Sequence, residues 1–350
     1  MRQNPATRTM VLALAALCMS AIAANTARAE GVTFEDLTLQ EAWAKAAETG
    51  QTILIEVSAA HCMACGDVKR EIWESPEGVA LAEDLICIRF DSTTPEGQAL
   101  NQYYPITGLP VVIFVRPDST EIDRVVGYTM GREKWIEEAE LLKTGYDPLP
   151  DLEEELAANP GSVRSYLPVL ERYLYRFRDA EAESLLMRIL ELDPENKHRQ
   201  ASQALIKFAK HARLIWNDMD KSYNYWKMIL ERFPDSPSVS GAVSGTYQAA
   251  MQLRRLDEWK EWICKLAEDH PESGRLQYSL AMNAKRGRLR GACFAKAART
   301  ARALGAGPAF LDTLAVELEG GEVPGRSSSQ HSLLVLSGSI LRGCGSMERH

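Results

Sequence analysis

The residues ILIEVSAAHCMACGDVKREIW, 53–73, decide the fold of the first part of the chain. They begin with an apolar run, 53–57, of the kind that forms a buried strand. A helical pattern follows from Cys65 to Trp73, and two cysteines, Cys62 and Cys65, stand where the strand gives way to the helix. The stretch therefore predicts a strand that leads directly into a pair of thiols at the start of a helix.

The same alternation of strands and helices extends on both sides of this stretch. Short apolar runs bounded by turn residues predict further strands, and amphipathic or proline-started segments predict helices. We expect strands at 52–58, 85–91, 108–115 and 122–128, and helices at 39–50, 65–73, 75–84, 95–104 and 131–145. Alternating elements of this kind predict an α/β layer fold.

Two cysteines at this spacing can serve several kinds of chemistry. A c-type haem anchor needs a histidine directly after the second cysteine, but Gly66 follows Cys65, so this interpretation fails. A structural zinc site needs four ligands, and the sequence has no second close pair of cysteine or histidine residues. A static disulfide, a metal-transfer site with two thiolates and a working redox pair remain open.

The position of the pair favours redox chemistry. The thiol of Cys62 would lie at the N-terminus of a helix, where unpaired N–H groups and the helix dipole favour an anion. A lower thiol pKa supplies the thiolate, which is the nucleophilic form. Cys65 would lie one turn later, in position to attack a mixed disulfide and release the product. We expect no cofactor and no metal ion.

At this point the sequence resembles the thioredoxin superfamily, from residue 30 to about residue 145. The stretch 53–73 resembles its strand–CxxC–helix core, and ITGLPVVIF, 106–114, resembles the segment whose cis-proline faces the active site. The CMAC motif, SPEGVALAEDL and the GLP turn are most similar to the periplasmic thioredoxin-like domain of the transmembrane reductase DsbD and its soluble relatives. The resemblance implies that Pro110 shapes the substrate groove.

Two polar residues near the cysteines receive roles from the resemblance, each beside a simpler interpretation. Glu56, six residues before Cys62, matches the buried acid that moves protons to the pair; many members have Asp there. Burial would disfavour its ionised form, as a relay requires, but it could instead face solvent. His61 replaces the usual aromatic residue and could stabilise the Cys62 thiolate when protonated, or be only an exposed loop residue.

The second half of the chain has a helical pattern alone. Three amphipathic segments each end at a proline, Pro194, Pro234 or Pro271, and another helix follows each one. The spacings of 40 and 37 residues are near the ~34-residue period of helix-turn-helix repeats. We therefore predict a divergent tetratricopeptide-like, all-α repeat domain after the α/β domain, with 291–310 as a candidate fourth unit. A basic run, 285–290, is a solvated loop or docks an acidic surface.

Charge and the chain ends divide the sequence further. Residues 30–147 carry 22 acidic and 9 basic side chains, a net charge of −13, whereas 148–350 carry 26 and 28, a net charge of +2. An acidic first domain argues against nucleic-acid binding there. The apolar N-terminal segment ends in Ala27-Arg28-Ala29, which predicts a cleaved signal peptide and the periplasm; a membrane anchor is the alternative. We expect a signal peptide at 1–29, a thioredoxin-like domain at 30–147, a helical repeat domain at 148–319 and a disordered tail at 320–350.

The other cysteines are expected to be structural. Cys87 lies in a predicted buried strand and should be an inert core thiol. Cys264 and Cys293 lie on helical patterns and should be core residues, with a disulfide between them left open. Six cysteines in the mature chain are too few for a disulfide-stapled scaffold.

The sequence as a whole predicts a periplasmic thiol–disulfide oxidoreductase of the protein-disulfide reductase type. Cys62 would attack, Cys65 resolve, Glu56 move protons and Pro110 shape the groove. Its partners would be protein thiols and disulfides, a membrane electron-donor reductase, and a protein bound on the helical repeats. The rival hypothesis is an envelope scaffold whose cysteine pair is a static staple or a metal clip.

Overall fold

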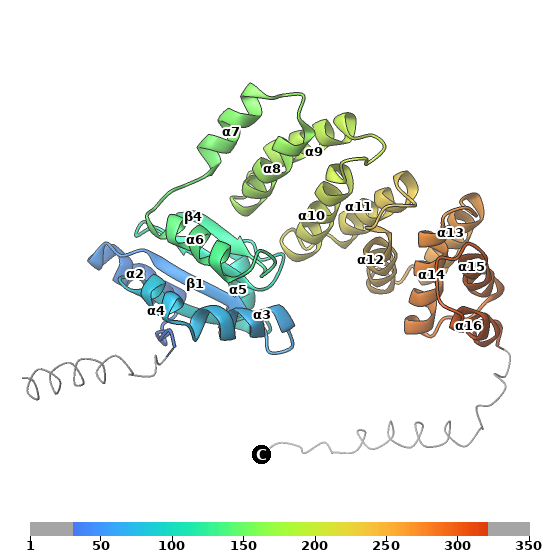
Figure 1. The fold of residues 1–350 in the computed structure, drawn as a ribbon, viewed down its shortest axis with the longest axis horizontal. Helices are drawn as coiled ribbons and strands as arrows, with labels where there is room; N and C mark the ends of the chain where they lie inside the picture. The colour runs from blue at the N-terminus through green and yellow to red at the C-terminus, as the bar shows by residue number, and fades with distance from the viewer. Residues whose placement is uncertain (1–30, 321–350) are drawn as a thin grey trace, which may run out of the picture. The chain divides into compact units, whose positions relative to one another are not determined.

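The computed structural model describes residues 31–320 and divides them into two compact units (Figure 1). One unit runs to Asn159 and includes Glu171–Asp179; the other holds Pro160–Leu170 and the residues from Ala180 onward. The predicted signal peptide, and the predicted tail after its first residue, lie outside the described residues. The predicted order, an α/β domain followed by an all-α domain, is confirmed. No helix within 31–320 is both long and apolar enough to cross a membrane.

The first unit is built on a four-stranded mixed sheet in the order β2-β1-β3-β4. β1 runs parallel to β2 and antiparallel to β3, and β3 runs antiparallel to β4. β1 is a central strand, and its residues 53–57 are buried on both faces of the sheet. The strands are β1 (Ile53–Ser58), β2 (Ile86–Asp91), β3 (Val111–Val115) and β4 (Glu121–Val126).

The alternation of side chains along β1 separates two cores. Ile53, Ile55 and Val57 face one core, which also holds residues of helix α2, whereas Leu54 faces the other with Val68, Trp73 and Trp135. Side chains two residues apart in a strand point to the same face, so Glu56 lies on the same face as Leu54, which the helix that carries the cysteines covers. The helices of this unit are α2 (Leu39–Thr49), α3 (Met63–Val68), α4 (Pro76–Ala82), α5 (Pro95–Ala99), α6 (Arg132–Lys143) and α7 (Leu149–Ala158).

Local sequence signals explain where these helices begin and end. Thr38 and Glu41 form a capping box at the start of α2, and Gly50 ends that helix with φ 74°, a conformation that glycine adopts at no cost. Ser75 caps α4, and Pro76 occupies its first turn, as the sequence predicts. The helix predicted at 65–73 begins earlier, at Met63, and continues from Lys69 to Trp73 as a π-helical turn.

The boundary between the units differs from the predicted one at 147/148. Helix α7 and Glu171–Asp179, which include the end of α8 (Tyr166–Tyr175), cluster with the α/β unit. Two arginines of this segment hold it there: Arg172 pairs with buried Asp123 at 2.6 Å, and Arg176 pairs with Asp147 at 2.7 Å. The change from mixed to purely helical periodicity therefore comes before the end of the first unit.

The second unit consists of successive helices joined by short turns, and three of these turns share a pattern. The turns before α10 (Gln200–Leu214), α12 (Val239–Gln252) and α14 (Gly274–Gly287) each hold a proline that is followed two residues later by a polar residue. The pairs are Pro194 with Asn196, Pro234 with Ser236, and Pro271 with Ser273. Asn196 Nδ2 donates to Ser236 Oγ at 3.1 Å, and Ser273 Oγ donates to the carbonyl of Pro234 at 2.8 Å. Neighbouring turns are thus hydrogen-bonded to one another.

These hydrogen bonds link consecutive turns whose prolines are 40 and 37 residues apart. Assignment to the tetratricopeptide repeats stays a prediction. The helices are α9 (Asp179–Leu192), α10 (Gln200–Leu214), α11 (Met219–Arg232), α12 (Val239–Gln252), α13 (Leu256–Asp269), α14 (Gly274–Gly287), α15 (Ala292–Ala303) and α16 (Phe310–Glu319).

Candidate redox site

The two cysteines of the CMAC motif are joined by a disulfide at the start of α3. Cys62 is the N-cap residue of the helix, and the two Cα atoms are 5.3 Å apart. The Sγ atom of Cys62 accepts a hydrogen bond from the backbone N–H of Cys65 at 3.2 Å. A sulfur in this position receives one of the unpaired N–H groups of the helix terminus, which would stabilise its thiolate after reduction.

The two cysteine residues differ in their exposure to solvent. Cys62 is half-buried, whereas Cys65 is buried, with 6% of its surface exposed. Met63, between them, is 89% exposed, so the turn projects from the surface of the unit. An incoming disulfide can therefore reach Cys62 more easily than Cys65; the roles of attacking and resolving cysteine stay predictions.

Pro110 lies at the same end of the sheet as the cysteine pair. The Leu109–Pro110 peptide bond is cis, and Pro110 directly precedes β3. Val111 is the register partner of Val57 in β1, so the start of β3 is adjacent to the end of β1 that leads to Cys62. The carbonyl of Pro110 accepts a hydrogen bond from Gly127 N–H at 2.8 Å, which holds the turn against the end of β4.

Glu56 is buried, as the sequence predicts, but it is also paired. Only 2% of its surface is exposed, and its carboxylate forms an ion pair with the guanidinium of Arg89 on the adjacent strand β2. Arg89 in turn stacks over the ring of Phe34, 3.8 Å from the ring centroid. The alternative that Glu56 faces solvent does not hold, whereas its role as a proton relay stays a prediction.

The sequence did not predict that Arg89 would pair with Glu56 beside the site. The signal for this pair is a cation in the otherwise apolar run 85–90, matched by an acid in the otherwise apolar run 53–57. The parallel register of β1 and β2 brings Glu56 opposite Arg89. Because a buried charge needs a partner, two lone charges in neighbouring buried strands indicate a pair.

His61 is exposed in the turn between β1 and α3. The pKa of Asp91, the last residue of β2, is lowered mainly by hydrogen bonds from Thr93 and to a smaller extent by the electrostatic influence of His61. The structure therefore places an acid within electrostatic reach of His61. Stabilisation of the Cys62 thiolate by His61 stays a prediction.

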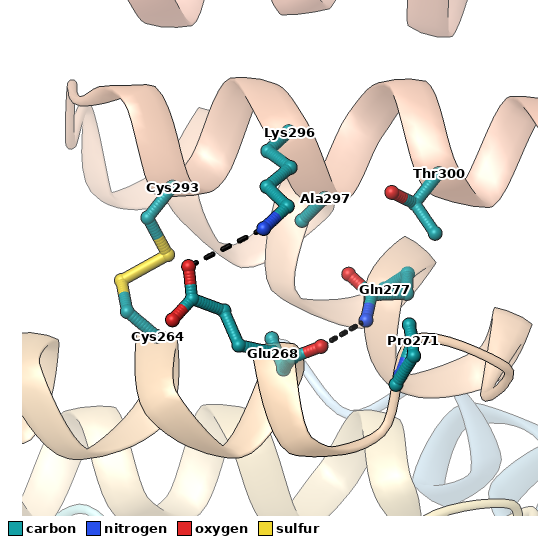
Figure 2. A pocket seen from close by; sticks show the side chains of 9 residues that line it. Cys264, Glu268, Pro271, Gln277, Cys293, Lys296, Ala297 and Thr300 are labelled. Atoms are coloured by element: carbon teal, nitrogen blue, oxygen red, sulfur yellow. Dashed lines mark hydrogen bonds and ion pairs between the residues drawn. A yellow bond between two sulfur atoms is a disulfide. The ribbon is translucent and has the colours of Figure 1, made fainter.

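The remaining cysteines of the described residues are structural in their surroundings. Cys87 is a free, buried thiol in β2, and burial raises its pKa to about 12. Cys264 on α13 and Cys293 on α15 form a disulfide with Cα atoms 5.8 Å apart, which answers the question that the sequence left open. Figure 2 shows this disulfide beside the ion pair of Lys296 with Glu268, whose atoms are 3.3 Å apart.

A structural metal site needs several ligating side chains close together. Within residues 31–320, no group of three or more His, Cys, Asp or Glu side chains lies close enough together to hold a metal ion. The cysteine pair is therefore not accompanied there by the further ligands that a structural metal site requires.

Parts of this chain are similar to known proteins. Residues 33–117 match a family model described as thioredoxin-like. The first unit is a thioredoxin-like domain. A solved DsbH oxidoreductase is 17% identical, with 34% of this chain and 88% of that chain covered and a TM-score of 0.28. A solved thioredoxin from Thermus thermophilus is 23% identical, with 32% of this chain and 88% of that chain covered and a TM-score of 0.29. No curated protein matches the chain.

The thioredoxin-like domain thus carries a CxxC pair at the start of a helix, a cis-proline at the same end of the sheet and a buried acid on the face that this helix covers. This combination of fold and cysteine pair supports a thiol oxidoreductase type of role.

Proposed function

We propose that this protein is a thiol–disulfide oxidoreductase that reduces disulfides in other proteins. The observation that carries the proposal is the asymmetry of the CxxC pair. Cys62 is half-buried and its sulfur accepts an N–H group at a helix terminus, whereas Cys65 is buried. A nucleophile needs access and a stabilised thiolate, and a resolving thiol needs proximity to the first sulfur.

The reaction starts from the reduced pair. The Cys62 thiolate attacks one sulfur of the substrate disulfide, a new S–S bond forms, and the other substrate sulfur leaves as a thiolate that takes up a proton. Cys65 then loses its proton and attacks the Cys62 sulfur, which releases the second substrate thiol. Two electrons have passed to the substrate, and the protein holds the Cys62–Cys65 disulfide.

Glu56 and Pro110 act on separate steps of this sequence. Glu56 takes the proton from Cys65 at the second step, supported by its burial on the sheet face that α3 covers. Pro110 shapes the groove beside Cys62, supported by its place at the same end of the sheet. The Cys62–Cys65 disulfide must then be reduced again by a dithiol. A membrane electron-donor reductase would supply the two electrons.

The protein works in the periplasm and binds its partner through the helical unit. The A-x-A pattern at residues 27–29 supports export. The test is mass spectrometry of protein purified from the envelope fraction, which should show Glu30 at the N-terminus. A chain that retains residues 1–29 would contradict cleavage and indicate an anchored protein.

The redox role is tested by equilibrating the full chain with dithiothreitol–disulfide mixtures, then alkylating and mapping the thiols by mass spectrometry. Cys62 and Cys65 should titrate together at a potential where the Cys264–Cys293 pair is still oxidised, so the second disulfide is an internal control. The reduced protein should also reduce a small generic disulfide. A pair that stays oxidised until the protein unfolds would identify a static staple and reject the proposal.

A further inference from the structure

The helical unit contains a pocket that none of the redox chemistry uses. It lies among α10, α11 and α12 and has a volume of about 180 Å³. All the residues that line it are within the described part of the chain, and none of them is acidic. They are Lys210, Arg213, Met219, Ser222, Trp226, Gly241, Ser244, Gly245, Gln248 and Ala249.

Two cations on one face of α10 contribute to this pocket. Lys210 and Arg213 are three residues apart, so they are neighbours on the helix surface. Neither forms an ion pair or a side-chain hydrogen bond within residues 31–320, in contrast to cations such as Arg176, Arg255 and Arg299, which pair with acids. The lining of this pocket therefore carries positive charge without compensation.

The surroundings of Lys210 show the same imbalance. Burial lowers the pKa of its ammonium group, and the charges of Lys207 and Arg213 lower it further. A nearby acid would act in the opposite direction. Lys210 is thus a half-buried cation whose neighbouring charges are also positive, and an anion in the pocket would relieve the repulsion.

The opposite wall offers neutral hydrogen-bond donors. Ser244 and Gln248 lie one turn apart on α12, and Ser244 Oγ accepts only a long contact, 3.4 Å, from Asn283 Nδ2. The hydroxyl hydrogen of Ser244 and the amide group of Gln248 have no acceptor among the described residues. An anion between α10 and α12 could therefore receive neutral donors from one side and charged donors from the other.

An indole ring gives the pocket an apolar wall. The ring of Trp226 lies so close to Gly245 that a Cβ atom there would be 2.6 Å from three of its atoms. Glycine at 245 therefore lets the ring rest against the backbone of α12 and keeps the pocket open. Met219 and Ala249 add further apolar surface.

We propose that this pocket binds a carboxylate carried on a short apolar stem. The two cations and the two neutral donors would hold the carboxylate, while the indole of Trp226 packs against the stem. A volume of about 180 Å³ suits a group of this size and not a long chain. The carboxylate can belong to a free small acid or to the end of a polypeptide, and the experiment separates these sources.

The experiment is isothermal titration of the full chain at low ionic strength with four probes. N-acetyl-leucine supplies a carboxylate with an apolar stem, N-acetyl-leucinamide lacks the charge, and inorganic phosphate lacks the stem. The fourth probe, acetyl-Ala-Ala-Ala-Leu with a free carboxylate, extends the stem. N-acetyl-leucine should bind, and its amide should bind at least tenfold more weakly, because hydrogen bonds to charged groups are the strong ones.

Matched variants locate the site. Lys210→Met and Arg213→Gln should each weaken N-acetyl-leucine binding by about tenfold or more. Gly245→Ala should weaken it by pushing the indole into the pocket. The control is Lys265→Met, which removes an exposed lysine of α13 that has no ion pair within the described residues and should leave binding unchanged. Each variant should keep the wild-type circular dichroism spectrum and the wild-type rate with a small disulfide, so failure of this site is distinguishable from failure of the redox function.

A second measurement needs no variant. Acylation of Lys210 by an amine reagent, followed by mass spectrometry, should slow when N-acetyl-leucine is present, and acylation of Lys265 should not change. Tighter binding of the tetrapeptide than of N-acetyl-leucine would assign a polypeptide end, and equal binding a free small acid. Equal binding of the acid and its amide, equal binding of phosphate, or no protection of Lys210 would each overturn the proposal.

Discussion

Replacing Arg89 should destabilise the thioredoxin-like domain more than replacing Glu56, although the two side chains share one ion pair. Glu56 has 2% of its side chain exposed and Arg89 has 38%. Arg89→Met leaves a carboxylate without a cation in a place that water does not reach, and it also removes the contact with Phe34. Glu56→Gln leaves a guanidinium that can turn toward solvent and that keeps an amide oxygen as an acceptor.

The magnitudes follow from this difference in exposure. Removing one partner of a buried ion pair costs about 3–5 kcal/mol when the remaining charge stays buried. Arg89→Met should approach this range, whereas Glu56→Gln should cost about 1 kcal/mol, the net value of an ordinary hydrogen bond. Glu56→Leu combined with Arg89→Met should be less destabilising than Arg89→Met alone, because no charge remains without a partner.

Hydrogen exchange with mass spectrometry on the intact chain measures these differences locally. Because about 1.4 kcal/mol corresponds to a factor of ten, amides of β1 and β2 should exchange about 100-fold to several thousand-fold faster in Arg89→Met. The same amides should exchange only about fivefold faster in Glu56→Gln. Arg70→Met is the control, since its pair with Asp67 is exposed and should contribute less than about 1 kcal/mol. If Glu56→Gln exchanges as fast as Arg89→Met, the assignment of the buried partner is wrong.

The variant Glu56→Gln also tests the relay. Its disulfide exchange should be slower than wild type near neutral pH, because Cys65 must lose its proton without a nearby base. The two rates should converge at high pH, where the thiol ionises unaided. Equal rates at every pH would leave Glu56 with a structural role alone.

Three further predictions concern the boundary, the second disulfide and the buried thiol. A fragment of 30–147 should unfold in less urea than one of 30–179, which keeps the arginines of α8; equal midpoints would support the boundary predicted from sequence. Replacing Cys264 and Cys293 by Ser should cost the helical unit about 3–4 kcal/mol, as expected for a loop of this length, without changing turnover of a small disulfide; unchanged urea unfolding of that unit would contradict this. Burial raises the pKa of Cys87 from 9.0 to about 12, so the contribution of the protonated thiol to the free energy of unfolding is complete below pH 9 and is lost as the pH rises through 12. Alkylation of Cys87 at pH 8 should therefore be about 1000-fold slower in the folded protein than in urea. Similar alkylation rates in the two conditions would mean that the thiol is accessible.

The sequence predicts the surroundings of the cysteine pair because local signals agree there. The apolar run 53–57 leads into Cys62, and the strand forms where the pattern places it, whereas the helix begins at Met63, before its predicted start at Cys65. The burial of Glu56 follows from its apolar neighbours on either side. Strand pairing decides the rest: Arg89 meets Glu56 only through the parallel register of β1 and β2, and register is not visible in one strand alone.

The features that the sequence did not predict depend on contacts between distant segments. Cys264 and Cys293 are 29 positions apart, and their pairing needs α13 and α15 to lie side by side. Arg172 belongs to a helix whose pattern resembles the helices after it, yet its partner Asp123 is in β4. A helical period shows that such a residue lies on a helix and does not show which unit the helix packs against.

Trapping of mixed disulfides tests the central claim, that Cys62 attacks and Cys65 resolves. The measurement is a non-reducing gel of envelope extracts from cells that express Cys65→Ala or Cys62→Ala. Cys65→Ala keeps the accessible sulfur and loses the thiol that would release the partner, so bands of high mass should appear and vanish with reductant. Cys62→Ala leaves only the buried thiol and should give almost none. Absence of bands from both variants, or more bands from Cys62→Ala, would contradict this account.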